Sequence, residues 1–272
     1  MPQLSMSPQL FTILSGVVAE HAGLHFDQEH AVIFADKVAA RAAAAGFESL
    51  LDYYYFLRYD EGGQAELDAL VEALVIGETY LFRELAPLET VVSEFVIPAV
   101  DSGRRPRIWC AACATGEEPH TLAMLLAARA VLDQVDIVAS DINRASLARA
   151  RSGRYSRRAL RADIPEFAEP WLHLTDREIT VEARLTAAID WQRINLMDAA
   201  AMAPLGTFDV ILCRNVLIYF DERTAQGVIQ RLNDRLRSGG ALVVGVSESL
   251  LRFGTSLVCE EHGGVFVYKK VS

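Results

Sequence analysis

A run of small residues and a later aspartate form the part of the sequence best suited to hold a nucleotide-like ligand. The run Ala111-Ala-Cys-Ala-Thr-Gly-Glu-Glu-Pro119 follows an apolar stretch, and its small side chains would let a ligand approach the backbone. Asp141 ends the next apolar stretch, where a carboxylate can accept hydrogen bonds from both hydroxyls of a ribose. A plain turn before a helix and a helix cap are the structural alternatives for these two features. Because Gly116 is the only glycine of the run, a cofactor without a pyrophosphate is favoured, although a dinucleotide stays open.

The cysteines offer a second kind of chemistry, which the sequence context disfavours. The chain has four of them, and Cys110 and Cys113 form a C-x-x-C pair. A structural zinc site needs a second close pair, and a thioredoxin-like site needs a different strand and helix context. We therefore predict reduced, buried thiols and no metal site.

These residues require a parallel sheet to position them. After Pro106, short apolar runs alternate with amphipathic segments, which indicates strand-helix units covered on both faces. The predicted strands are RIWCA, VDIVASD, FDVILCRN and ALVVGVSE; the predicted helices start at Glu117, Arg144 and Glu222; and SLVCEE with GVFVYKK predicts a closing antiparallel hairpin.

The N-terminal third has a different pattern. From Gln9 to about Phe82, apolar residues recur at helical spacing and strand-like alternation is absent. We predict a helical domain over 1–85, a linker helix and turn over 86–106, and an α/β domain over 107–272. The segment 171–191 lacks a clear helix and is predicted to form a small antiparallel excursion.

The charge distribution limits the partners. The first 90 residues contain 14 acidic and four basic residues, a net of −10, which equals the charge of the whole chain. This makes generic nucleic-acid binding unlikely, because phosphate contact needs a basic surface. A run of arginines without an intervening acid is either a solvated face or a surface for an acidic partner; it comprises Arg144, Arg149, Arg151, Arg154, Arg157, Arg158 and Arg161. With no long apolar run or signal-peptide pattern, we expect a cytoplasmic monomer that does not insert into membranes.

Several motifs in order and spacing resemble the chemotaxis receptor methyltransferases of the CheR type. They are GETYLFRE at 77–84, RIWCAACATGEEPHTLAM, SDIN, INL, FDVILCRNVLIYFD, SGG and GVSESL. The resemblance extends from about residue 10 to the end of the chain. It implies a Rossmann-like methyltransferase domain with a small inserted antiparallel β-subdomain, an all-α domain before it, and S-adenosylmethionine as methyl donor.

The resemblance also implies roles for individual residues. Thr79 and Arg83 match residues that reach the cofactor from the N-terminal domain, Asp141 matches the ribose acid, and Tyr219 matches the aromatic beside the reactive methyl group. The full set of implied cofactor residues is Gly77, Thr79, Arg83, Ala112, Glu118, Asp141, Asn195, Leu196, Arg214, Asn215 and Tyr219.

Three positions depart from the family pattern. Gly77 replaces an asparagine, Ala112 replaces a glycine common in the cofactor loop, and His120 replaces a tyrosine. Gly77 removes a side-chain hydrogen bond and could weaken cofactor binding without changing the chemistry. We expect His120 on the helix surface or in the pocket wall.

The implied reaction needs no general base, because a glutamate carboxylate is already ionised at neutral pH. Orientation and desolvation must then supply most of the catalysis. We predict that Arg83 holds one carboxylate oxygen while the other attacks, so that Arg83 and Tyr219 are the catalytic pair. A surface ion pair with Glu84 or Glu78 is the structural alternative for Arg83.

The predicted function is methylation of glutamate side chains on chemoreceptors or receptor-like signalling proteins. A signalling module with little turnover is the alternative, and a small-molecule carboxyl methyltransferase is a third hypothesis. The resemblance implies a basic N-terminal helix that meets an acidic receptor, but here that helix keeps only Lys37 and Arg41 and the region is acidic, so steering to it should be weak or repulsive. We expect docking through Lys37, Arg41 and arginines such as Arg154, Arg157 and Arg158. Some family members bind a receptor-tail pentapeptide through a longer β-subdomain loop, so this compact chain is predicted to act independently of the tail.

Overall fold

A computed structural model describes residues 4–271 and divides the chain into two compact units. One unit contains residues up to Ile76 together with Tyr219–Thr224, and the other contains Gly77–Ile218 and the chain from Ala225. The boundary therefore lies before the GETYLFRE motif rather than at residue 85, because Leu81 and Phe82 bond to residues of the second unit. Leu81 N donates to Ala159 O at 2.8 Å, and Phe82 N donates to Thr121 Oγ1 at 3.1 Å.

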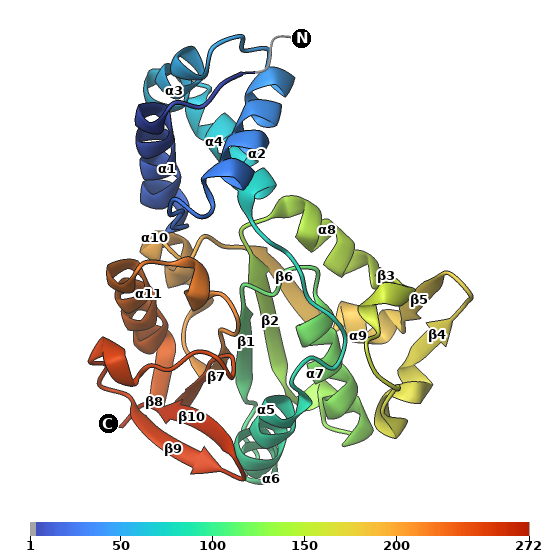
Figure 1. The fold of residues 1–272 in the computed structure, drawn as a ribbon. Coiled ribbons are helices and arrows are strands. Elements are labelled where there is room, and N and C mark those ends of the chain that lie inside the picture. Colours follow the sequence, from blue (N-terminus) through green and yellow to red (C-terminus); the bar gives the residue numbers. More distant parts are fainter. Residues whose placement is uncertain (1–3, 272) are drawn as a thin grey trace. The chain divides into compact units, whose positions relative to one another are not determined.

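The helical unit is built from four helices around an apolar core (Figure 1). The helices are α1 (Pro8–Ala22), α2 (Ala31–Ala44), α3 (Leu50–Tyr59) and α4 (Gly63–Leu74). Ser7 caps α1 by accepting a hydrogen bond from Leu10 N, and Gly23 ends it in the left-handed conformation. Phe11 and Phe34 meet edge to face, with ring centroids 5.3 Å apart. The segment Tyr219–Thr224 joins this unit through a bridge between Leu24 and Phe220.

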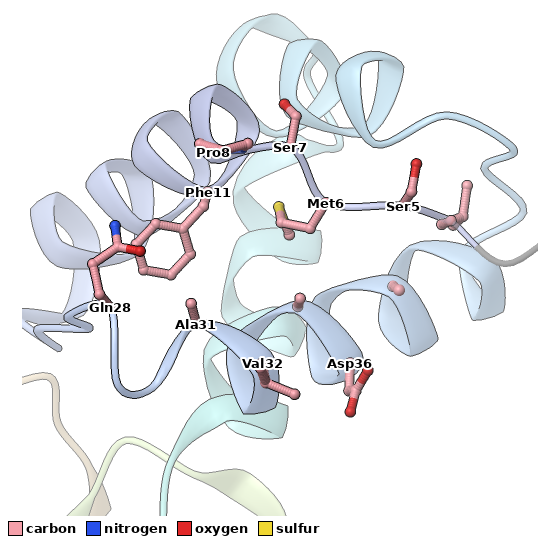
Figure 2. Close-up of a pocket in the computed structure, with 12 residues that line it drawn as sticks. Ser5, Met6, Ser7, Pro8, Phe11, Gln28, Ala31, Val32 and Asp36 are labelled. Carbon is pink, nitrogen blue, oxygen red and sulfur yellow. The ribbon is translucent and has the colours of Figure 1, made fainter.

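A groove lies on this helical unit. It has a volume of about 570 Å³ between the start of α1 and the outer face of α2. Figure 2 shows Phe11 and Gln28 on one side of it, and Val32 and Asp36 on α2. The residues that line it include none of the predicted cofactor residues.

The second unit contains a seven-stranded sheet in the order β6-β2-β1-β7-β8-β10-β9 (Figure 1). The strands are β1 (Arg107–Ala111), β2 (Asp136–Asp141), β6 (Ile189–Arg193), β7 (Phe208–Leu212), β8 (Leu236–Val243), β9 (Val258–His262) and β10 (Val265–Lys269). Along this order, the strands from β6 to β8 pair in parallel, and β10 lies antiparallel to both β8 and β9. The apolar run of β7 is buried throughout, as expected for a central strand. The predicted α/β fold with a closing hairpin is confirmed.

Helices connect these strands and cover the sheet. They are α5 (Leu85–Thr90), α6 (Ile97–Asp101), α7 (Glu117–Ala128), α8 (Arg144–Ser152), α9 (Ala183–Ala187), α10 (Ala199–Met202) and α11 (Glu222–Arg235), with a π-helical turn at Val91–Val96 and short 3-10 turns elsewhere. The segment predicted as a linker helix forms the helices from α5 to α6, and these are part of the α/β unit rather than a linker. Leu88, Val91 and Val96 are buried in the core of the α/β unit.

The small inserted sheet differs from its predicted extent. It consists of β3 (Arg154–Ser156), β5 (Glu178–Val181) and β4 (Leu172–Leu174), paired antiparallel (Figure 1, yellow). It therefore begins before residue 171, and Ile189–Arg193 belongs to the main sheet instead. The reason is pairing: β6 lies parallel to β2, with Ile189 buried opposite Ile137.

Candidate active site

The loop between β1 and α7 has an unusual backbone. Ala112, Ala114 and Gly116 all have positive φ angles, of 58°, 47° and 89°. A Cβ on Gly116 would lie 2.6 Å from Ala150 Cβ, so only glycine fits there. The left-handed conformation is unfavourable for alanine, and such strain persists only where surrounding contacts hold it. The loop is therefore a fixed element at the carboxyl edge of the sheet.

Asp141 is one of the groups that hold this loop. The residue is 9% exposed; Oδ2 accepts a hydrogen bond from Ala114 N at 2.8 Å, and Oδ1 accepts one from Asn143 N at 2.9 Å. The cap of α8 is Asn143, whose Oδ1 accepts from Ser146 N. The capping alternative for Asp141 is therefore filled by Asn143, and the ribose role of Asp141 stays a prediction.

Two further predicted cofactor residues lie beside Asp141. Ile194 N donates to Asp141 O at 3.1 Å, which brings the chain after β6 to this edge. There the Asn195 side chain accepts a hydrogen bond from Met197 N, and the carbonyl of buried Leu196 accepts one from Arg231. Asn195 and Leu196 thus lie at the carboxyl edge of the sheet, next to the end of β2.

Arg214 is the centre of a buried ion cluster after β7. Its side chain is 2% exposed, with Nη1 at 2.8 Å from Glu118 Oε2 and Nη2 at 2.8 Å from Glu84 Oε2. Burial tends to raise the pKa of Glu84, but the hydrogen bonds from Arg214 outweigh it and the pKa falls below its usual value. Burial raises the pKa of Glu118, with Arg214 opposing the rise. Within residues 4–271, the buried Nε of Arg214 has no hydrogen-bond acceptor.

Arg83 lies next to this cluster without a short ion pair of its own. Its Nε is 3.9 Å from Glu84 Oε1, and Nη1 donates to Glu78 O at 3.4 Å. The guanidinium is 5.7 Å from the centre of the Tyr80 ring. Because Glu84 bonds to Arg214 instead, the surface ion pair considered for Arg83 is weak. Gly77 and Thr79 precede it on the same segment and are exposed and half-buried, respectively.

Glu248 was not predicted as a site residue, although the GVSESL motif contains it. Its Oε2 accepts hydrogen bonds from Asn215 N and Gly245 N, both at 2.7 Å, and its Oε1 accepts one from Leu217 N at 2.8 Å. Asn215 has a positive φ of 58°. One carboxylate thus joins the ends of β7 and β8 and fixes the loop that carries Arg214.

Glu248→Ala is expected to lower the melting temperature and to weaken affinity for S-adenosylhomocysteine by about tenfold or more, because three amides lose their acceptor. Glu248→Gln should lose less, since its carbonyl oxygen can keep the two bonds made by Oε2. Thermal denaturation and calorimetry measure both effects. Equal affinity in the wild type and the alanine variant would show that the loop does not depend on this carboxylate.

His120 corrects an expectation, since it lies neither on the helix surface nor in a pocket wall. It is fully buried on α7, with Nδ1 at 2.7 Å from Tyr155 Oη and Nε2 at 3.0 Å from Thr186 Oγ1. Burial lowers the pKa of His120 to about 4. Its ring is therefore neutral at physiological pH.

Tyr219 and the predicted docking residues differ in their hydrogen bonds and their exposure. Tyr219 belongs to the helical unit, where its carbonyl accepts from His25 N, so its role beside the methyl group rests on the resemblance. Arg41 makes a bidentate pair with Glu66, and Lys37 donates to Leu74 O. In the small sheet Arg154 pairs with Glu178. Arg157 and Arg158 lie in the turn after β3 and are exposed.

The four thiols are free, and the prediction that they are buried is wrong for Cys259. Cys110, Cys113 and Cys213 are buried and Cys259 is half-buried. Burial raises the pKa of the three buried thiols well above the usual value, which makes them unreactive. Over the part of the chain that the structure describes, no group of three potential metal ligands is found, and no helix is long and apolar enough to span a membrane.

Comparison with known proteins decides the family. Residues 77–261 match the family model described as the SAM-binding domain of CheR methyltransferases. This chain belongs to the CheR methyltransferase family. It is 31% identical over 242 residues to chemotaxis protein methyltransferase 2 of Vibrio cholerae, which covers 87% of this chain and 84% of that protein. It is 33% identical over 216 residues to chemotaxis protein methyltransferase 1 of Pseudomonas aeruginosa, covering 75% and 77%.

A relative named for biofilm formation is also similar. The probable biofilm formation methyltransferase WspC of Pseudomonas aeruginosa is 31% identical over 205 residues, covering 72% of this chain and 47% of that protein. The family identity makes the chain a methyltransferase that uses S-adenosylmethionine, as the sequence motifs predicted.

The residues at the carboxyl edge of the sheet have groups that suit S-adenosylmethionine. The cofactor has a ribose, a carboxylate, an ammonium and a positive sulfonium. Asp141 would hold the ribose, and the buried Nε of Arg214, which lacks an acceptor among the described residues, suits the carboxylate. Glu84 and Glu118 offer negative charge for the positive groups.

Proposed function

We propose that this enzyme transfers a methyl group from S-adenosylmethionine to glutamate side chains of a chemoreceptor or receptor-like signalling protein. The products are a glutamyl methyl ester and S-adenosylhomocysteine. The observation that carries the proposal is the convergence of Asp141, Glu118 and Arg214 at one sheet edge, in a chain whose relatives are named chemotaxis protein methyltransferases.

The described residues support a mechanism without a general base. His120, a histidine of the implied cofactor helix, is buried and uses both ring nitrogens in hydrogen bonds. When bound, the cofactor supplies an electrophilic methyl group. Arg83 orients the glutamate by holding one oxygen, and the buried edge excludes water, which strengthens the attraction between carboxylate and sulfonium. Tyr219 is assigned to the wall beside the methyl group.

Labelling of native membranes tests the substrate class. The purified enzyme and S-adenosylmethionine labelled in its methyl group are incubated with membranes of the host bacterium, and labelled proteins are identified by mass spectrometry. The expected result is label on a receptor-like signalling protein. Cofactor binding without label on any protein would favour the alternative, a signalling module with little turnover. Three features favour it: Gly77, the left-handed Ala112 where glycine is common in the family, and the acidic N-terminal domain. Label on free carboxylic acids alone would indicate a small-molecule methyltransferase.

Docking is proposed to use the exposed arginines rather than the helical unit alone. Arg41 is occupied by Glu66, so its charge is largely neutralised, whereas Arg157 and Arg158 extend from the turn after β3. An acidic receptor helix would be attracted to this turn. Lys37, Arg41 and Arg154 stay candidates for docking, with a weaker attraction for the acidic receptor helix.

The compact small sheet supports tail-independent methylation. Only Thr175, Asp176 and Arg177 separate β4 from β5, and Thr175 closes this turn through bonds with Glu178. We expect no micromolar binding of a chemoreceptor C-terminal pentapeptide by calorimetry, and equal methylation of a receptor with and without its last five residues. A rate that collapses on this truncation would contradict the proposal.

A further inference from the structure

A buried hydrogen-bonded chain connects the small sheet with the cofactor loop. Tyr155, at the centre of β3, is 1% exposed and its hydroxyl donates to Thr115 O at 2.9 Å. The same hydroxyl is 2.7 Å from Nδ1 of His120, and Nε2 of His120 is 3.0 Å from Thr186 Oγ1. The chain thus joins β3, α7, the end of α9 and the loop after β1.

Only one arrangement of hydrogens satisfies every member. The carbonyl of Thr115 can only accept, so the single hydroxyl hydrogen of Tyr155 is donated there. Nδ1 of His120 must then donate to Tyr155, and Nε2 must accept from Thr186. The neutral ring of His120 provides one donor and one acceptor, as this arrangement requires.

The hydrogen-bonded chain contacts the strained part of the loop between β1 and α7. Thr115 lies between Ala114, whose N–H donates to Asp141, and Gly116, which only fits as glycine. Asp141 and Tyr155 therefore hold adjacent residues of one loop. Because Ala112 and Ala114 are left-handed, the loop needs such outside contacts to keep its conformation.

We propose that Tyr155, supported by His120 and Thr186, is a positioning residue for cofactor binding, so that the small sheet β3-β5-β4 helps to shape the cofactor site. The inference rests on the proposed assignment of Asp141 and the β1–α7 loop to the cofactor. The hydroxyl of Tyr155 fixes Thr115, and through it the backbone that faces the ligand. A distortion of the small sheet, for example by a bound partner, would change cofactor affinity by the same route.

Tyr155→Phe tests this role because it keeps the ring and removes only the hydroxyl. We expect affinity for S-adenosylhomocysteine to weaken about fivefold to thirtyfold, with kcat at saturating cofactor largely kept and KM for the cofactor raised. Tyr53→Phe is the matched control, since Tyr53 is fully buried in the helical unit and its hydroxyl donates to Glu66. The control should lose stability without a change in cofactor affinity.

Thr186→Val tests the chain from its other end and leaves Tyr155 intact, which protects the test should Tyr155→Phe fail to fold. It leaves Nε2 of His120 without its donor, and we expect affinity to weaken about threefold. Wild-type affinity in a folded Tyr155→Phe, or in Thr186→Val, would overturn the positioning role even if the melting temperature falls. A wild-type protein that binds no S-adenosylhomocysteine would instead overturn the proposed cofactor site, and this inference with it.

Discussion

Asp141→Ala is expected to weaken affinity for S-adenosylhomocysteine by about a hundredfold to ten-thousandfold. The ribose would lose two charge-assisted hydrogen bonds, at about 1.5 to 3 kcal/mol each. The amides of Ala114 and Asn143 would also lose their acceptor, which releases the loop beside the ribose. Isothermal calorimetry with the purified protein measures the change.

Asn143→Ala is the matched control for this prediction. It removes the cap of α8, at about 1 kcal/mol of stability, but leaves the carboxylate of Asp141 in position. Its affinity should stay within a few-fold of the wild type. An unchanged dissociation constant in Asp141→Ala would return Asp141 to a purely structural role.

Arg83→Ala is expected to remove most methyl transfer, by about a hundredfold or more in kcat, while cofactor affinity stays within about tenfold. The reason is that Arg83 has no short ion pair, since Glu84 is engaged by Arg214. Its guanidinium is thus available to the incoming glutamate carboxylate. Arg83→Lys should recover part of the rate, because a lysine keeps the charge but not the planar fork.

Arg161→Ala controls for the shared surroundings of Arg83. Arg161 lies over the same Tyr80 ring, at 4.4 Å from its centre, and pairs with Glu78 of the same motif. It should keep near-normal turnover. Normal turnover in Arg83→Ala would refute the assignment, and joint loss of binding and turnover would make Arg83 a cofactor residue.

The sequence predicted the elements that have strong local patterns. The strand Arg107–Ala111 has the boundaries expected from its apolar run, and the next helix starts at Glu117, as its acidic first turn indicated. Strand β6 was missed because Asp190 and Gln192 make it half-polar, and its partner β2 is about 50 residues earlier. The helices from Leu85 to Asp101 were taken for a linker because their apolar face reveals burial only once the sheet is present.

The site was predictable where a motif pointed to it and not where distant partners set the role. The position of Asp141 at the end of a strand was predicted from the apolar run before it, whereas its role toward a ribose stays a prediction. The partner of Arg214, Glu84, lies 130 residues away, and no local pattern indicates that pairing. The burial of His120 likewise depends on Tyr155 and Thr186, which come from separate elements. Glu248 was in a quoted motif, but its role follows from three amides that only the fold brings together.

The methyl group is expected to end as an ester on a glutamate side chain of a protein. The purified enzyme is incubated with methyl-labelled S-adenosylmethionine and the cytoplasmic part of a host chemoreceptor, and the receptor is analysed by peptide mass spectrometry and by mild alkali treatment. We expect a single added methylene mass on glutamates, and label that alkali releases as methanol, with neither seen for Asp141→Ala. Label that is stable to alkali and located on a nitrogen or sulfur atom would contradict it.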